Sequence, residues 1–207
     1  MDRGLNSLLQ WGIQNSEGNQ QEQPNGTPAP RNLVNEEAIR SLMGGPSDAD
    51  LMKQAMHVIR NPEATPENKM TAFDNFEQLI ENLDNANNME PLGLWTPLIE
   101  LLSDPEADLR RMAAWCIGTA VQNNLKSQER FLAMNGIPVL CKVANEDPDK
   151  VVRRKAVYAL SSEVRNYQPG MDEASKCLPK NITGLDHISA ENMDVIDAIM
   201  ARLRNRE

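Results

Sequence analysis

The sequence predicts an all-α protein built as a solenoid of stacked helical repeats, and three observations support that fold class. The segment that begins at Asp104, DPEADLRRMAAWCIG, recurs 43 residues later at Asp147 as DPDKVVRRKAVYALS. Ala, Leu and Met, which favour helices, are frequent, and β-branched runs are nearly absent. The length of 207 residues accommodates one elongated domain with a tail. Self-similarity at this stride is typical of units that bury their apolar faces against one another.

The N-terminal region is expected to stand apart from the repeats. Residues 1–16 are predicted to form a short amphipathic helix, with apolar residues at helical spacing: Leu5, Leu8, Leu9 and Ile13. Residues 17–32 contain no large apolar side chain and are rich in Gln, Asn, Gly and Pro. Such a stretch cannot offset its ordering entropy by burial, so a flexible, disordered linker is predicted.

The armadillo-like repeat domain is expected to span residues 33–207. Caps and prolines divide it into predicted helices over 36–43, 51–59, 66–83, 106–123, 128–134, 137–144 and 150–167. A short, a medium and a long helix per stride of about forty residues is the armadillo pattern, whereas HEAT repeats, the second choice, normally have two helices. After Tyr167 the pattern becomes irregular, and Ser189 is expected to cap a last helix, giving a capping helix over 189–204.

Composition and charge exclude several classes of function. The 21 basic and 30 acidic residues give a net charge of −9, which disfavours nucleic acid as a partner. No apolar run is long enough to span a membrane, so no membrane association is expected. Cys116 and Cys141 fit small core positions, and with Cys177 they show no zinc-ligand spacing. His57 and His187 are isolated, and no nucleophile or phosphate-binding motif occurs, so no metal, cofactor or catalytic residue is predicted.

The predicted long helices present a polar face that the repeat would make continuous. In the first unit its residues are Asp74, Glu77, Gln78, Glu81, Asn82 and Asn85, opposite the core positions Phe73, Phe76, Ile80 and Leu83. The second unit offers Trp115, Gly118, Thr119, Gln122 and Asn123, and the third offers Tyr158, Ser161, Ser162, Arg165 and Asn166. On one helix this would be a solvated face. When such faces are stacked on the concave side of a solenoid, they predict a protein-binding surface. For Trp115, half-buried packing is an equally weighted alternative.

Two further stretches carry a resemblance to a known family. AFDNFEQLIENLDNANN, from Ala72 to Asn88, is followed by CIGTAVQNN, from Cys116 to Asn124. Together they resemble the armadillo-type nucleotide exchange factors of the seventy-kilodalton heat-shock chaperone, the fungal Fes-type proteins and their HspBP-type animal relatives. LNSLLQWGIQNS and LMKQAMHVIRNPE resemble the fungal cytosolic branch. The similarity runs from residue 5 to about Asn166, without the linker.

The resemblance implies a co-chaperone and not an enzyme. Its concave surface would grip the ATPase domain of the chaperone and favour a conformation that binds ADP poorly, after which ATP rebinds and the client is released. The N-terminal segment would assist client release. The N-terminal run SLLQWGI is too short and interrupted for a signal peptide, so a cytoplasmic protein is expected, with a nuclear pool left open, and a monomer is expected as well. Family members commonly carry further repeats after the third, whereas this sequence continues into the irregular segment and a single helix.

Contact residues follow from the resemblance and from the projected polar face. The resemblance implies Glu81, Asn82, Asp84, Asn85, Ala86 and Asn87, with the small side chain of Ala86 allowing close approach of the partner. The projected face adds Thr119, Gln122, Asn123 and Arg165.

Two other functions are weighed against this one. A peptide-binding adaptor such as a nuclear-import receptor would share the recurring asparagines Asn82, Asn123 and Asn166. Such receptors place a Trp four residues before the Asn, whereas Trp115 lies eight before Asn123. A metal-dependent or thiol enzyme lacks any constellation of ligands or nucleophiles in the sequence.

Overall fold

A computed structural model describes residues 45–184 and 187–205 of the chain. Its contacts divide the chain into two units, Met1–Ser47 and Asp48–Glu207. The second unit carries all of the helices described below, and its described residues contain no strand. The predicted N-terminal amphipathic helix, the linker and the helix over 36–43 lie outside the described residues.

The repeat domain begins with a pair of antiparallel helices, α3 (Asp48–Arg60) and α4 (Pro66–Ile80). Thr65 caps α4 by accepting a hydrogen bond from the Asn68 N–H, and Pro66 occupies the first turn, where its missing N–H costs nothing. Phe73 and Phe76 of α4 are fully buried, as their helical spacing predicts.

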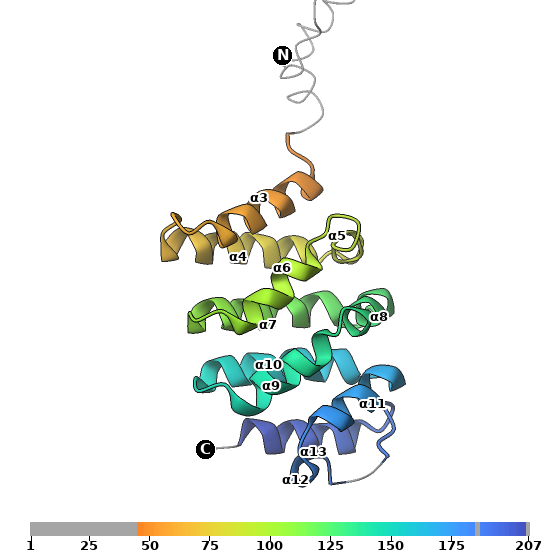
Figure 1. The fold of residues 1–207 in the computed structure, drawn as a ribbon. Helices are drawn as coiled ribbons and strands as arrows, with labels where there is room; N and C mark the ends of the chain where they lie inside the picture. The colour runs from red at the N-terminus through yellow and green to blue at the C-terminus, as the bar shows by residue number, and fades with distance from the viewer. Residues whose placement is uncertain (1–44, 185–186, 206–207) are drawn as a thin grey trace, which may run out of the picture. The chain divides into compact units, whose positions relative to one another are not determined.

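Three units of three α-helices each follow in the described residues and stack in chain order (Figure 1), and each unit ends with its longest helix. The first contains α5 (Leu83–Asn88), α6 (Trp95–Glu100) with the 3-10 turn η2 (Leu101–Ser103), and α7 (Ala107–Val121). The second contains α8 (Leu125–Ala133), α9 (Gly136–Glu146) and α10 (Lys150–Val164). The third contains α11 (Gln168–Cys177), α12 (Lys180–Thr183) and α13 (Met193–Arg204). The all-α, armadillo-like fold predicted from the stride is therefore confirmed.

The last unit is more regular than its sequence suggests. Met193 begins α13 at 43 positions after Lys150 begins α10, so the stride of the preceding unit continues. The cap of α13 is Asn192, whose side chain accepts from the Val195 N–H, and not Ser189. Ser189 instead accepts a hydrogen bond from the Glu191 N–H in the turn before the helix. The short α12 hides the repeat in the sequence, because four residues carry no recognisable periodicity.

The long helices are shorter than predicted at their C-terminal ends. Asn123 and Asn166 adopt left-handed backbone conformations, with φ of 53° and 56°, directly after α7 and α10 have ended. The helices end at Gln122 and Arg165, whose backbones are extended, and the asparagine then supplies the left-handed residue of the turn. Asn82 instead caps α5 by accepting from the Asp84 and Asn85 N–H groups. The asparagines that recur in frame thus either lie in the turn between two helices or begin the next helix.

The repeated Asp-Pro turns lie within the first and second units, each just before the long helix, and their side chains connect one unit to the next. The Arg110 guanidinium donates to the Asp104 and Pro105 carbonyl oxygens at 2.8 and 2.9 Å. Arg153 makes the same contact with the Asp147 carbonyl at 2.8 Å. Arg110 also holds the Asp147 carboxylate with two hydrogen bonds, of 2.6 and 3.0 Å. Each turn is therefore closed by its own arginine, and the first arginine reaches into the second turn.

Candidate protein-binding site

The polar faces of α4, α7 and α10 enclose an open hollow, which we call the long-helix groove. These helices lie one below another in Figure 1, and α4 and α10 both pack against α7. The groove has a volume of about 500 Å³ and is lined by Glu77, Glu81, Trp115, Thr119, Gln122, Asn123 and Tyr158. Close packing of α7 and α10 depends on Gly118, since a Cβ there would lie 2.5 Å from the Tyr158 ring.

Several groove side chains are already paired within the protein. The Thr119 hydroxyl donates to Glu77 Oε1 at 2.7 Å, which joins α7 to α4 and leaves Glu77 9% exposed. The Tyr158 hydroxyl donates to Gln122 Oε1 at 2.9 Å, which joins α10 to α7. Because these bonds form without a partner, they fix the shape of the groove before anything binds.

Trp115 is half-buried against the core, with a cation over its ring. Lys155 Nζ lies 3.7 Å from the centroid of the Trp115 ring. Burial lowers the pKa of Lys155, and the nearby positive charge of Arg111 lowers it further, while Glu77 opposes the shift. Lys155 contacts the groove residue Trp115 and was not singled out from the sequence, although it precedes Tyr158 by one helical turn.

The structure separates the residues of ENLDNANN into exposed and buried ones. Glu81, Asn82 and Asp84 are exposed at the end of α4 and the start of α5. Asn85 is buried, and its amide donates to Asp48 Oδ2 at 2.8 Å and to the Leu79 carbonyl at 3.0 Å. The expected single polar face through residue 85 is wrong, because the chain turns at Asn82 and α5 starts in a new direction.

Two neighbouring positions need correction as well. Ala86 is 2% exposed in the core, so the expectation that its side chain faces a partner is wrong. An arginine there would meet the packed interior and displace α5, which makes Ala86→Arg a folding variant and not a docking variant. Leu83, expected in the core, is 55% exposed. Asn87 is half-buried.

Arg165 lies at the edge of the same face, where α10 meets α13. Its guanidinium forms an ion pair with Asp197 of α13 and donates to Ser161 Oγ at 3.0 Å. Asp197 was missed by sequence reasoning because the last helix was expected to be only a cap. Thr119, Gln122 and Asn123 line the long-helix groove with Glu81, whereas Arg165 continues the face beyond it.

The described residues carry no signature of chemistry or of membrane insertion. Among residues 45–184 and 187–205, no group of three potential metal ligands gathers. Burial raises the pKa of the Cys116 thiol, which therefore remains protonated in the core. Within the described part of the chain, no helix has the length and apolar character needed to cross a bilayer.

The fold and the groove define a helical-repeat protein with a preformed polar contact face. Residues 5–89 match the model of the family described as nucleotide exchange factor Fes1, and residues 96–179 match that of HEAT repeats. The chain is 54% identical to the Hsp70 nucleotide exchange factor FES1 of Coccidioides immitis, over 99% of the chain and 98% of that relative. The chain belongs to the Fes1 family of Hsp70 nucleotide exchange factors.

Other relatives agree with this family assignment, and a solved structure agrees with the fold. The FES1 protein of Gibberella zeae is 51% identical over 99% of the chain and 97% of its own length. That of Candida glabrata is 49% identical, but the match covers 79% of the chain and 56% of the relative. A designed armadillo repeat protein solved with a (KR)4 peptide superposes with a TM-score of 0.55 at 16% identity, over 74% of this chain and 68% of its own. That identity shows a shared fold alone.

Proposed function

We propose that the chain is a co-chaperone that binds the ATPase domain of Hsp70 through the long-helix groove and promotes the release of ADP. ATP then rebinds, and the client polypeptide leaves the chaperone. The observation that carries this proposal is the 54% identity to a named Hsp70 nucleotide exchange factor over nearly all of both chains. The groove supports it by offering a preformed polar face on the repeat domain.

The proposed mechanism is a linkage between two binding equilibria. A partner that binds the ADP-free conformation of the chaperone more tightly than the ADP-bound one must weaken ADP binding by the same factor. No bond is made or broken by the chain, so its role is that of a binding protein and not an enzyme. It would act as a monomer in the cytoplasm, without nucleic acid, membrane or cofactor.

The structure suggests which side chains are available to the chaperone. Thr119 is bonded to Glu77, and Tyr158 is bonded to the side-chain oxygen of Gln122, so these two bonds hold the groove in shape. Glu81, Gln122 and Asn123 are exposed on the groove wall and are the candidates for direct contact. An exposed carboxylate next to amide groups suits a partner surface that presents basic side chains and hydrogen-bond donors.

The test is the release of a fluorescent ADP analogue from Hsp70, followed by stopped flow with and without the chain. Wild-type protein is expected to accelerate release, and an unchanged rate at saturating protein would refute the proposed function. Glu81→Arg reverses a charge on the groove wall and is expected to raise the concentration needed for half-maximal acceleration about tenfold or more.

A matched charge reversal controls for general electrostatic effects. Glu146 is exposed at the end of α9, outside the groove residues, so Glu146→Arg is expected to leave acceleration unchanged. If both variants lose activity equally, the groove is not the contact surface even though the exchange activity stands. Circular dichroism of both variants checks that the helices remain folded.

A further inference from the structure

Two exposed leucines stand at the same position of consecutive repeats. Leu83 is the first residue of α5 and Leu125 is the first residue of α8, so each directly follows the asparagine that caps its helix. Their exposed fractions are 55% and 56%. A single surface leucine needs no explanation, but an apolar residue that recurs at one exposed position of a repeat does. Packing within the chain does not explain the pair, because each residue remains more than half exposed.

Both leucines adjoin the long-helix groove. Leu83 follows the groove residue Glu81 by two positions, and Leu125 follows the groove residue Asn123 by two positions. The helices that begin with these leucines, α5 and α8, contact each other and lie at the same end of the long helices in Figure 1. The two leucines therefore continue the polar wall of the groove with a pair of apolar side chains.

The third unit has a polar residue at the equivalent position. Gln168 is the first residue of α11, directly after the cap Tyr167. Its amide donates to Asp172 Oδ1 at 2.7 Å and to the Ile188 carbonyl at 2.9 Å. This side chain is thus used within its own unit, whereas the two leucines are presented to solvent.

The extent of the groove explains why the third unit differs. The groove reaches the C-terminal ends of α4 and α7 at Glu81 and Asn123, which are the ends from which α5 and α8 start. On α10 its wall is Tyr158, in the middle of the helix, and not the end from which α11 starts. An exposed leucine therefore stands where the groove meets the next helix, and a glutamine stands where it does not.

We propose that Leu83 and Leu125 are apolar anchors that bind the ATPase domain of Hsp70 beside the groove. This inference rests on the proposed exchange function. Protein interfaces commonly bury an apolar centre inside a polar rim, and exposed polar residues flank both leucines here. The fitting surface of the chaperone presents one apolar patch for each leucine. Basic groups would adjoin the patch for Leu83, whose exposed neighbours Glu81 and Asp84 are acidic.

The test is stopped-flow release of the fluorescent ADP analogue from Hsp70, with variants of the full chain. Leu83→Gln and Leu125→Gln give each position the residue type of the third unit. Each is expected to raise the concentration for half-maximal acceleration roughly fivefold, because about half of a leucine side chain remains to be buried, and the double variant roughly twentyfold. The loss should persist at high salt, where the effect of Glu81→Arg should shrink.

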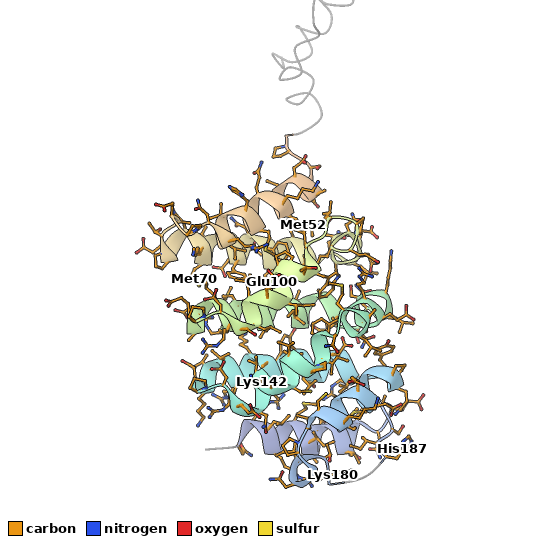
Figure 2. All side chains as sticks on the ribbon, in the orientation of Figure 1. Met52, Met70, Glu100, Lys142, Lys180 and His187 are labelled. Carbon is orange, nitrogen blue, oxygen red and sulfur yellow. The ribbon has the colours of Figure 1, made fainter. Side chains whose placement is uncertain are left out.

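Val151→Thr is the matched control, since Val151 is an apolar residue that is 55% exposed at a distance from the groove. It lies near the start of α10, and Met70, near the start of α4, marks that end of the long helices in Figure 2, away from α5 and α8. Val151→Thr is expected to leave acceleration unchanged. Melting followed by circular dichroism should be the same for all variants, because every replaced side chain is exposed.

The outcomes separate this inference from the exchange function itself. Failure of the wild-type protein to accelerate ADP release would refute the proposed function and the anchors with it. Acceleration by the wild type that the double leucine variant matches would refute the anchors alone. Sedimentation velocity examines a second copy of the chain as the occupant: a wild-type dimer that the leucine variants dissociate, with exchange unchanged, would also overturn the inference.

Discussion

Glu163 shows how a single buried carboxyl group can govern the response of the domain to pH. It lies on α10, is 0% exposed, and neither carboxyl oxygen has a hydrogen-bond partner within the described residues. Burial raises the pKa of Glu163 to about 9. The side chain is therefore protonated in the folded protein at neutral pH, whereas it is ionised in the unfolded chain.

The difference in pKa gives stability a definite pH dependence. Below the ordinary glutamate pKa, near 4.5, Glu163 is protonated in both states and contributes no pH dependence. As the pH rises from there toward 9, the unfolded state ionises first, so folding stability falls by at most about 1.4 kcal/mol per pH unit.

Glu163→Gln is expected to remove this dependence, because glutamine has the same shape and is neutral in both states. In urea unfolding, the free energy of unfolding of the variant should exceed that of the wild type by an amount that grows between pH 5 and pH 8.5. Glu146→Gln, at an exposed position, should show no such gain. Unfolding free energies for wild type and Glu163→Gln that run parallel across this range would contradict the buried-carboxyl explanation.

At the scale of elements, the Asp-Pro turns repeat their sequence but not all of their contacts. Asp104 and Asp147 both accept a hydrogen bond from the N–H two residues on, at 2.8 and 2.9 Å. Only the Asp147 carboxylate is gripped by an arginine of the preceding unit, Arg110, and its side chain is 4% exposed. Burial is the largest single influence on Asp147 and opposes its ionisation. The hydrogen bonds from Arg110 and from the Asp149 N–H, with the positive charges of Arg110 and Arg153, together outweigh burial and hold the pKa of Asp147 below its usual range.

Equivalent substitutions in the two turns therefore have different expected costs. Asp147→Ala leaves the Arg110 guanidinium, 12% exposed, without its carboxylate and should lower the unfolding free energy by roughly 3 kcal/mol. Asp104→Ala loses a turn hydrogen bond and should cost about 1 kcal/mol. Because the pKa of Asp147 is depressed, the wild-type advantage should be lost as the pH falls through that value. Guanidinium unfolding at pH 7 and pH 3 measures both effects. Equal losses of unfolding free energy in the two variants at neutral pH would argue against a stabilising Arg110–Asp147 ion pair between units.

The end of each long helix is a second point where repeats differ. Asn123 and Asn166 provide one left-handed residue after α7 and α10. After α4, the chain instead passes directly from Glu81 to Asn82, which caps α5. The connection there is one residue shorter. Ala86 nevertheless follows the repeat, because Gln128 and Met171, which also stand four residues after the cap of their helix, are buried too.

At the scale of the whole molecule, the proposed exchange function makes a quantitative demand. If the chain weakens ADP binding to Hsp70 by some factor, ADP must weaken binding of the chain by that factor, typically 5- to 150-fold. Titration calorimetry of the chain into nucleotide-free and ADP-saturated Hsp70 gives one factor, and ADP titration with and without the chain gives the other. Unequal factors would mean that the three species do not form a simple linked system.

Much of the fold was predictable because its signals are local. Thr65 and Pro66 mark the start of α4 by capping chemistry that acts within one turn, and helical spacing identifies Phe73 and Phe76 as core. The groove was partly predictable for the same reason, since Thr119, Gln122 and Asn123 share a face with Trp115. Lys155 and Asp197 were not found, because their importance lies in contacts across helices.

The sequence by itself determined the class of protein, the stride of the stack and the family, since caps, periodicity and a repeated segment are short-range properties of the chain. The tertiary structure decided which polar residues remain available. Glu77 and Glu81 lie one helical turn apart on α4, yet Glu77 is bound to Thr119 and buried, whereas Glu81 is exposed. Burial and pairing depend on residues distant in the chain, and local patterns carry no record of them.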